Sequence, residues 1–356
     1  MKSTRPLTIS AQFGLVDQTE FFKKSVAGAD LSNYYLLSKG EFAYNKSYSD
    51  GYPLGAIKRL DRYDSGVLSS LYICFVPKPY MSSDYLVQYF ESTKWNQVVK
   101  DISGEGARNH GLLNVPVTGF FETQHYIPKR DEQEKLGAFL TLIEKRIATQ
   151  SKIIEELTTL RSALIEECAK QSGNCISLSD ILREVEERST TANQYQVLSS
   201  TVKGIFSQKE YFNKDIASED NKGYKVVRKG HVVLSPQNLW MGNINYNDQF
   251  DIGIVSPSYK VFSIKEGFNP IFIAALLQTK KALNEYMLAS EQGASIVRRN
   301  LNIEAFMAIK FRIPDARQQD SLSLAITAIN AKLNNERCYL EQLTMQKSCL
   351  LENMFI

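Results

Sequence analysis

One stretch of this chain occurs twice, and each copy has the apolar spacing of a long α-helix. The first copy is 131–170 and the second is 316–354. Apolar residues recur in both at steps of three, four or seven, which is the seam of an amphipathic helix or coiled coil. The first seam consists of Leu136, Phe139, Ile143, Ile147, Ile154, Leu157 and Leu164. The matching positions, each 186 residues later (322 − 136), are Leu322, Ala325, Ile329, Leu333, Leu340, Leu343 and Leu350.

Two helices of this length set the framework of the fold. Each would be about 50 Å long, and a lone helix cannot bury its own apolar stripe. Two similar helices in one chain most simply bury their stripes against each other. The alternative is a pair of ordinary core helices in one globular domain, and both their length and a second repeat count against it.

The second repeat precedes each long helix. Seven pairs lie 190 positions apart: Gly14 with Gly204, Gln18 with Gln208, Phe22 with Phe212, Ala27 with Ala217, Asp30 with Asp220, Tyr34 with Tyr224, and Gly40 with Gly230. After a change of loop length beyond Asn45, six pairs lie 187 apart: Gly55 with Gly242, Ile57 with Ile244, Gly66 with Gly253, Ser69 with Ser256, Tyr72 with Tyr259, and Phe75 with Phe262. Short apolar runs broken by Gly, Asn, Asp and Pro predict strands, so the repeated unit is β-rich.

The order of segments is the same in both halves. After the β-rich part we expect a helix (84–100 or 270–288), a Gly-Ala loop (103–114 or 290–302) and a last strand, roughly 120–127 or 306–313. An x-Pro element, Ile127-Pro128 or Ile313-Pro314, leads into the long helix, as I-P-x-x-x-x-Q-x-x-L. A period this long, present twice, indicates internal pseudo-twofold symmetry.

The halves differ at their starts. The second half begins with an extra segment in which 178–186 predicts a short capped helix, whereas only seven residues precede Thr8 in the first half. We expect either that the first domain lacks its opening segment or that another segment fills that place.

Composition limits the classes of function without naming one. The 356 residues are 43% hydrophobic and 23% charged, an ordinary globular mixture with room for two or three domains. The net charge of +3 is weakly basic, so nucleic-acid binding would rely on local basic loops or on partners. The N-terminus lacks an apolar leader and the apolar run 271–277 is too short to span a bilayer, so we expect a cytoplasmic protein.

Motifs for chemistry are missing from the sequence. The five cysteines contain no C-x-x-C spacing and the three histidines are scattered singly, so we expect neither a disulfide framework nor a metal site. The chain has no phosphate-binding G-x-x-x-x-G-K-[ST] loop and no dinucleotide fingerprint. It also lacks the Asn-Pro-Pro-Tyr or Asp-Pro-Pro-Tyr tetrad with which adenine methyltransferases hold a flipped base. These absences favour a binding protein over an enzyme.

Loops of the β-rich repeats interleave cations, amides and aromatic rings. Arg and Lys neutralise phosphates or bond guanine, while Asn and Gln can bond adenine in two places, so these residue types suit DNA reading. Solvated loops of ordinary polar composition are the alternative, but two similar modules suit a target with two half-sites. The candidate DNA-binding residues are Lys46, Tyr48, Lys58, Arg59, Arg62, Arg108, Asn109, Gln237, Asn238, Trp240, Asn243, Asn245, Arg298 and Arg299.

The chain resembles the specificity (S) subunits of type I restriction-modification systems over almost its whole length. The resemblance rests on QTEFF/QKEYF, SNYYLLSKGEFAYN/KGYKVVRKGHVVLS and GVLSSLYICF/GIVSPSYKVF, on the Gly-Ala loops, and on the lead into each helix. It implies an α+β fold: two β-rich target-recognition domains, each followed by a long helix, with the helices packed as an antiparallel coiled coil. The implied domains are 1–130 and 173–315, and the implied helices are 131–172 and 316–356.

The resemblance also implies a function and partners. Each recognition domain would read one half of a bipartite site in double-stranded DNA. The helical seams would space the domains and dock methyltransferase (M) subunits, probably two, and restriction (R) subunits would complete the complex. S-adenosylmethionine, ATP and Mg would then belong to the partners, with no cofactor in this non-catalytic chain.

Three alternatives remain open at this point. The chain could be a coiled-coil scaffold whose β domains bind protein, or a self-contained enzyme with a site across the two halves. It could also be a truncated or inactive specificity gene product, because of the short first domain.

Overall fold

The computed structural model describes residues 5–24, 28, 30–108, 112–212, 221–292 and 299–355. The chain divides into two compact units: unit 1 comprises 1–151 with 338–356, and unit 2 comprises 152–337. Each unit combines one β-rich half of the chain with a stretch of both long helices, α5 (Arg130–Ser172) and α11 (Ala316–Asn353). None of the helices in the described ranges has the length and apolar character needed to cross a membrane.

Unit 1 is built from short antiparallel strands and short helices ahead of α5. The strands are β1 (Leu7–Ser10), β2 (Gly14–Asp17), β3 (Tyr35–Ser38), β4 (Phe42–Asn45), β5 (Ala56–Arg59), β6 (Ser65–Leu68), β7 (Ile73–Phe75), β8 (Gly104–Arg108) and β9 (Leu112–Asn114). The helices are α1 (Gln18–Phe22), α2 (Ser83–Glu91), α3 (Asn96–Ile102) and α4 (Val117–Glu122). The central sheet has the order β5-β4-β7, and β1–β2, β3–β6 and β8–β9 form separate pairs.

Unit 2 repeats this plan. Its strands are β10 (Asn174–Ser177), β11 (Leu182–Glu184), β12 (Leu198–Thr201), β13 (Gly204–Ser207), β14 (Lys225–Arg228), β15 (His231–Leu234), β16 (Ile244–Tyr246), β17 (Ile252–Val255), β18 (Lys260–Ile264), β19 (Ser290–Gln292), β20 (Arg299–Leu301) and β21 (Lys310–Ile313). Its helices are α6 (Leu178–Ile181), α7 (Gln208–Phe212), the 3-10 turn η1 (Leu239–Met241), α8 (Pro270–Leu276), α9 (Lys280–Leu288) and α10 (Ile303–Ala308). The central sheet has the order β11-β18-β15-β16, one strand more than in unit 1. The predicted α+β architecture with internal duplication is therefore confirmed.

A repeated glycine shows why the two halves share sequence. A Cβ built on Gly66 would lie 2.3 Å from Leu7 Cδ1, and one built on Gly253 would lie 2.4 Å from Leu198 Cδ1. Both leucines are buried, Leu7 in β1 and Leu198 in β12. Only a residue without a side chain leaves room for that leucine, so the same packing has kept glycine in both copies.

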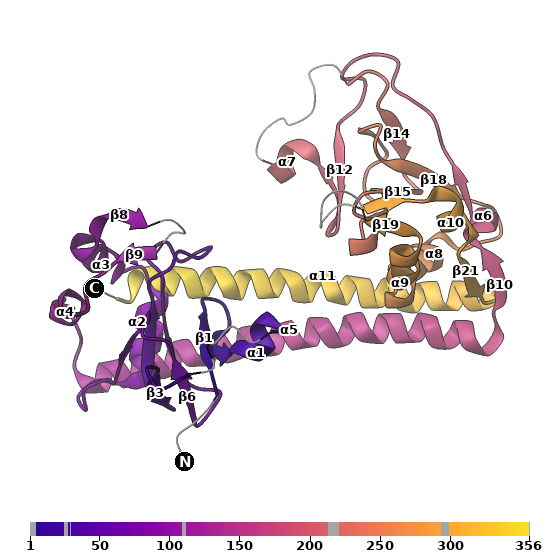
Figure 1. Cartoon of the computed structure of the whole chain (residues 1–356). Coiled ribbons are helices and arrows are strands. Elements are labelled where there is room, and N and C mark those ends of the chain that lie inside the picture. Colours follow the sequence, from indigo (N-terminus) through magenta and orange to yellow (C-terminus); the bar gives the residue numbers. More distant parts are fainter. Residues whose placement is uncertain are drawn as a thin grey trace. The chain divides into compact units, whose positions relative to one another are not determined.

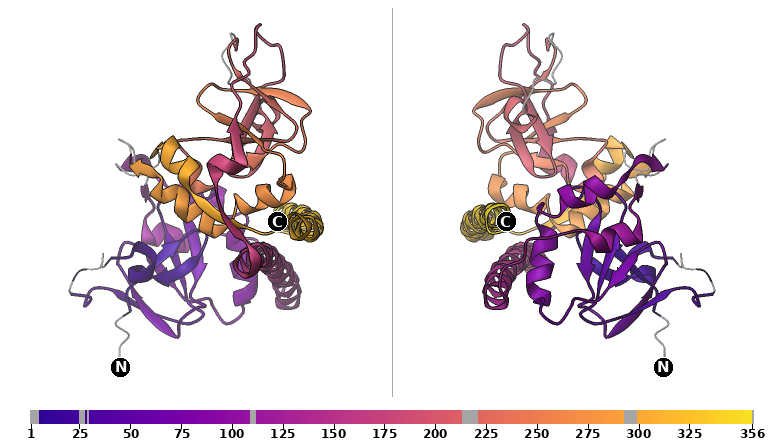
Figure 2. Two further views of the ribbon diagram at one scale, coloured as in Figure 1. Left: turned by 90° about the vertical axis from the view of Figure 1, so that its right-hand side faces the viewer. Right: turned by 90° about the vertical axis from the view of Figure 1, so that its left-hand side faces the viewer.

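The long helices pack side by side and antiparallel (Figure 1), and Figure 2 shows them end-on. In unit 1, Lys347 Nζ lies 2.7 Å from Glu144 Oε1. In unit 2, Arg161 Nη1 donates to Asn330 Oδ1 at 2.8 Å. Glu144 and Asn330 are matched positions, 186 apart, and so are Arg161 and Lys347. The two contacts are therefore equivalents under the pseudo-twofold repeat.

The buried line along the helices differs from the predicted seam, most clearly at Phe139 and Ala325. Ile143, Leu333 and Leu343 are buried as expected, and nine further seam residues are half-buried: Leu136, Ile147, Ile154, Leu157, Leu164, Leu322, Ile329, Leu340 and Leu350. Phe139 is 44% exposed and Ala325 is also exposed, whereas their neighbours Leu140 and Ile326 are fully buried. At this level each helix packs onto its own β-rich part as well as onto the other helix, so the buried face is rotated by one residue.

The core of each unit contains both long helices. In unit 1, Leu140 from α5 and Phe355, just beyond α11, pack with Tyr85 and Trp95. In unit 2, Ile326 from α11 and Ile165 from α5 pack with Phe272 and Phe311. A separate smaller core lies under the strands of each unit, around Leu7 or Leu198. The helices are thus part of the domains and not only spacers.

Several predicted elements have different bounds. The expected helices 84–100 and 270–288 are each two helices, α2 with α3 and α8 with α9, and the Gly-Ala loops are largely hairpins. The expected helix 178–186 ends at Ile181, because the chain then pairs with β18 as β11. The expected last strand 120–127 was wrong: α4 occupies its start, and 124–127 forms no strand. Its counterpart β21 is a strand because β10 pairs with it.

Candidate nucleic-acid interface

The fold brings two of the candidate loops of unit 1 to one place. The carbonyl of Lys46, in the loop after β4, accepts a hydrogen bond from the N–H of Leu113 at 3.0 Å. Leu113 belongs to the hairpin β8–β9, in which Arg108 pairs with Leu112. Lys46 and Tyr48 therefore lie beside the hairpin that carries Arg108.

Unit 2 repeats this arrangement. The carbonyl of Gln237, in the loop after β15, accepts a hydrogen bond from the N–H of Arg299 at 3.2 Å. Arg299 belongs to β20, the strand equivalent to β9. Each unit thus joins a polar loop to a hairpin at the same position in its fold, and we call these the loop–hairpin patches.

Arg299 and Trp240 form the best-defined part of the patch in unit 2. The Arg299 guanidinium carbon lies 5.5 Å from the Trp240 ring centroid. The same guanidinium donates to the carbonyls of Met287 (3.1 Å) and Ser290 (3.3 Å), at the end of α9. Its orientation is therefore fixed by two carbonyls and an aromatic face, a geometry that suits an arginine presented to phosphate or base.

Lys58 and Arg59 form ion pairs within unit 1. Lys58 Nζ bonds to Glu91 and, at 3.2 Å, to the Tyr52 hydroxyl. Burial, together with Glu91, raises the pKa of Tyr52, so this hydroxyl stays protonated. Arg59 donates to Asp61 and Asp84, both at 2.7 Å.

Arg59 remains a cation throughout. Burial lowers the pKa of its guanidinium, but the carboxylates of Asp84 and Asp61 raise it by more. Lys58 and Arg59 lie in β5, not in a loop, and their bonds to Glu91 and Asp84 join this strand to α2.

Asn243 and Asn245 are buried and hydrogen-bonded within unit 2. Asn243 Oδ1 accepts from the Ser200 hydroxyl at 2.8 Å, and its Nδ2 donates to the Ser200 carbonyl at 2.9 Å. Asn245 Nδ2 donates to the Ser200 hydroxyl at 2.8 Å and to the Thr201 carbonyl at 2.7 Å. Asn245 lies in β16 and Asn243 directly before it, so both amides join this part of the chain to β12.

The remaining candidates are more accessible. Tyr48 is 63% exposed, and Arg62 and Gln237 are exposed, while Lys46 and Asn238 are half-buried. Asn109 and Arg298 lie outside the described residues, and so does the side chain of Arg108.

Sequence reasoning missed the role of two glutamines. Gln133 Oε1 accepts from the N–H of Ser82 at 2.8 Å, and its Nε2 donates to the Pro128 carbonyl at 2.9 Å. Gln319 makes the same two bonds, to the N–H of Asn269 (2.8 Å) and the Pro314 carbonyl (2.9 Å). Both side chains are buried. The sequence signal for this role was the glutamine of I-P-x-x-x-x-Q-x-x-L. In the structure this glutamine joins the start of each long helix to the N-cap residue of α2 or α8.

Among the residues that the structure describes, no three His, Cys, Asp or Glu side chains form a group suited to a metal ion.

Comparison with known proteins identifies the fold. No protein-family model matches the chain, and no curated protein matches it in sequence. A crystal structure of the S subunit of a type I restriction-modification system from M. genitalium matches with a TM-score of 0.51 and 14% identity, over 90% of this chain and 83% of that one. The fold is that of a type I specificity subunit.

A second structure agrees with this fold. It comes from work on the structural basis of complex assembly and conformational transition of the type I R-M system. It matches this chain with a TM-score of 0.50 and 12% identity. The match covers 98% of this chain and 91% of that one. At these identities the likeness concerns the fold, including its duplicated β-rich parts and paired long helices.

Proposed function

We propose that this chain is the DNA-binding specificity subunit of a type I restriction-modification complex. The observation that carries the proposal is the match of both halves, together with their antiparallel helices, to a fold solved as an S subunit. A protein with two similar binding patches suits a DNA site with two separate halves. The bipartite site would be asymmetric, because the loops of the two patches differ in sequence.

In this proposal the loop–hairpin patches contact DNA. Lys46 and Arg299 would neutralise phosphates or bond guanine, and Gln237 and Asn238 would bond base edges. Arg62 follows β5 at the end of the β4–β5 pair opposite to Lys46, so it would contact phosphate outside the patch. Tyr48 and Trp240 would supply aromatic surface. Arg108, Asn109 and Arg298 belong to the same proposal: Arg108 ends β8, Asn109 follows it in the sequence, and Arg298 precedes Arg299 in the sequence. Lys58, Arg59, Asn243 and Asn245 would act indirectly, by fixing loop conformation.

The proposal assigns catalysis to other subunits. The helical seams of α5 and α11 would space the domains and dock two methyltransferase subunits, and restriction subunits would complete the nuclease. S-adenosylmethionine, ATP and Mg would be bound by those partners, and this chain would be non-catalytic.

The test is co-expression with a methyltransferase subunit encoded beside this chain, followed by sequencing of the host genome for modified adenines. We expect a bipartite motif that disappears when this chain is omitted. A motif that persists without the chain would contradict the proposal. Failure of the two proteins to copurify would favour the scaffold alternative.

A further inference from the structure

The tip of the hairpin β1–β2 lies beside the loop–hairpin patch of unit 1, although none of its residues was a predicted DNA contact. The tip consists of residues 11–13, between the paired strands. Gln12 Nε2 donates to the Asp50 carbonyl at 3.4 Å. Asp50 belongs to the loop after β4 that also carries Lys46 and Tyr48. The tip of this hairpin therefore contacts the loop of the patch.

The matching hairpin of unit 2, β12–β13, has the same neighbour. Asn243 is the last residue of the loop that carries Gln237, and its Nδ2 donates to the Ser200 carbonyl at 2.9 Å. Asn245 Nδ2 donates at 2.7 Å to the carbonyl of Thr201, the residue directly before the tip. In both units, then, this hairpin adjoins the loop of the patch and extends the same surface.

The two tips carry an aromatic ring in one unit and a cation in the other. Phe13 is 61% exposed at the tip in unit 1. The residue 190 positions later is Lys203, which is exposed at the tip in unit 2. A single exposed apolar residue is ordinary on a protein surface. Here, however, one place in the repeat holds the two side-chain types that stack on bases and neutralise phosphates.

The tip that carries Phe13 is fixed by the fold. Four residue pairs join β1 to β2, and Ile9 and Leu15 are buried in the small core beneath them. The N–H of Phe13 donates to Ser10 Oγ at 3.1 Å. Gly14 has a φ of +76°, a conformation that favours glycine and lets the chain turn back into β2. A side chain on so rigid a turn loses little conformational freedom when it binds.

We propose that these tips contact DNA, with Phe13 inserted between two base pairs of one half-site and Lys203 on a phosphate beside the other. The inference rests on the proposed DNA-binding function. DNA is the occupant because the tips are continuous with the patches and because the position of Phe13 holds a cation in the other unit. Phenylalanine can unstack the base step that it enters, and pyrimidine–purine steps open at the lowest cost. Phe13 thus adds a preference for such a step without a hydrogen bond to any base.

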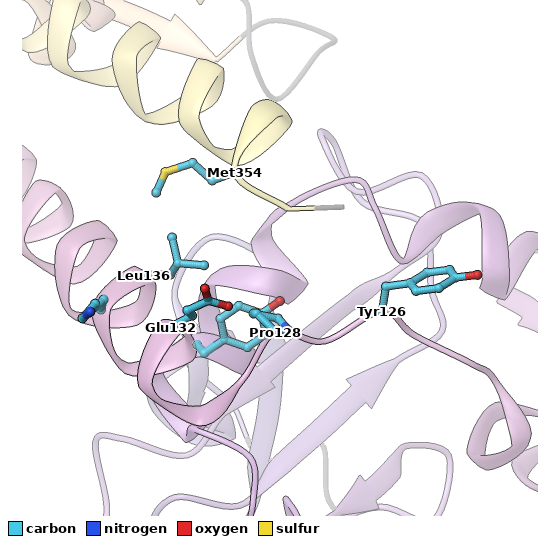
Figure 3. A pocket seen from close by; sticks show the side chains of 7 residues that line it. Tyr126, Pro128, Glu132, Leu136 and Met354 are labelled. Atoms are coloured by element: carbon cyan, nitrogen blue, oxygen red, sulfur yellow. The ribbon is translucent and has the colours of Figure 1, made fainter.

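A second exposed aromatic residue of unit 1 supplies a matched control. Tyr126 is 81% exposed and, with Tyr85 and Leu136 among others, lines a cavity of about 330 Å³ (Figure 3). Tyr85 lies in the first turn of α2. The loop of the patch is joined to the last residue of the same helix, because the Tyr52 hydroxyl donates to Glu91 at 2.8 Å. The cavity is therefore at the opposite end of α2 from the patch.

The test uses the complex of the full chain with its methyltransferase subunit, and a DNA duplex that contains the modified motif. Phe13→Ser should weaken binding by about tenfold or more through loss of stacking, and should leave the salt dependence unchanged because no charge is lost. Phe13→Leu, which keeps an apolar side chain, should retain most of the affinity. Lys203→Ala should lower the slope of log affinity against log salt concentration by about one. Tyr126→Ser should change neither quantity.

Insertion of the ring is detected with 2-aminopurine, a base whose fluorescence rises when it is unstacked. The probe is placed in turn at each position of both half-sites. We expect a rise at one step that is present with the unmodified chain and with Phe13→Leu, and absent with Phe13→Ser. A rise at the methylated adenine should be the same in all three complexes, because the methyltransferase extrudes that base.

Four results would overturn the proposal while the unmodified complex still binds its motif. The first is unchanged affinity and fluorescence with Phe13→Ser, and the second is an unchanged salt slope with Lys203→Ala. The third is equal weakening by Tyr126→Ser, since the effect would not belong to the tip. The fourth is loss of copurification with the methyltransferase in Phe13→Ser, because the ring would then contact protein. Failure of the unmodified complex to bind any duplex would contradict the proposed function, and this inference with it.

Discussion

Gly137 shows how one position sets the approach of a long helix to its domain. A Cβ on Gly137 would lie 2.8 Å from the Tyr85 nitrogen and 3.0 Å from the Asp84 carbonyl carbon. The counterpart in unit 2 is Ser323, whose hydroxyl accepts from Asn269 Nδ2 at 3.3 Å. The same junction is thus closed by direct backbone approach in unit 1 and by a side-chain bond in unit 2.

We expect Gly137→Ala to destabilise unit 1 by about 1–3 kcal/mol, because the new methyl group meets backbone that cannot move aside. The gain in helix propensity, up to about 1 kcal/mol, would offset only part of this cost. Gly119→Ala, in α4, is the matched control, since its nearest neighbour would be 3.8 Å away. Urea unfolding of both variants measures the difference. Equal stability would show that α5 can shift without cost.

His125 makes the stability of unit 1 depend on pH. Its ring bonds to the Tyr89 hydroxyl and the Thr123 hydroxyl, both at 2.9 Å, and burial lowers its pKa. A lowered pKa in the folded state means that the unfolded chain binds the proton more readily. The contribution is therefore complete above the unfolded pKa, about 6.5, and is lost as pH falls toward the folded value.

We expect His125→Phe, which installs the residue type of the counterpart Phe311, to reduce the loss of stability between pH 7.5 and 5. Loss of the two hydrogen bonds should lower stability at pH 7.5, so the slope with pH is the informative quantity. The measurement is the unfolding free energy across this range. His231, whose pKa burial also lowers, stays unchanged and contributes to the residual slope. A slope identical to that of the unmodified chain would exclude His125 as its source.

At the scale of elements, the long helices are joined to the domains by buried polar contacts as well as by apolar packing. Gln133 and Gln319 satisfy a cap N–H and a proline carbonyl at the start of each helix. Buried groups of this kind are costly to leave unpaired. The glutamine therefore fixes the angle between domain and helix at a point where apolar packing alone would permit sliding.

Gln133→Ala should lower the stability of unit 1 by about 1–3 kcal/mol, because the Ser82 N–H and Pro128 carbonyl lose their partners. Gln346→Ala, at an exposed position of α11, is the control and should change stability by less than about 0.5 kcal/mol. Thermal unfolding at neutral pH measures both. A similar effect of both variants would mean that the two bonds contribute little.

The helix pair can be tested at Leu343, which is buried, and at Met345, which is 72% exposed on the same helix. Leu343→Asp should destabilise unit 1 by more than about 2 kcal/mol, because it buries a carboxylate without a partner. Met345→Asp should have little effect on folding. Circular dichroism during urea unfolding, and copurification with the methyltransferase subunit, provide the readouts. Normal assembly of the Leu343 variant would remove the seam from the docking proposal.

At the scale of the whole molecule, the duplication predicts that the two patches read separate halves of one DNA motif. Gln237→Ala should relax the modified motif in one half only, at a cost of about 1–3 kcal/mol for each base that the glutamine reads. Tyr48→Ala with Arg62→Ala should affect the other half or weaken binding uniformly. Sequencing of modified adenines after co-expression of each variant gives the result. Changes in both halves from one variant would contradict separate reading.

The sequence by itself determined the duplication, the long helices and the order of elements. These are local properties: apolar spacing of three and four residues specifies a helix whatever it packs against. The matched glycines and the repeated motif before each long helix then indicated the α+β fold class. The same periodicity placed Phe139 on the seam, because spacing alone cannot show that a helix packs against two neighbours at once.

The tertiary structure alone decided how individual polar and strand-forming residues are used. Lys58 and Arg59 are residue types that suit DNA binding. In the structure, however, they form ion pairs with Glu91, Asp84 and Asp61. Residues 124–127 have the alternation of β21, but a strand also needs a neighbour, and only unit 2 supplies one among the described residues. Ion pairing and strand pairing join residues far apart in the chain, so their outcome depends on which partners the fold brings together.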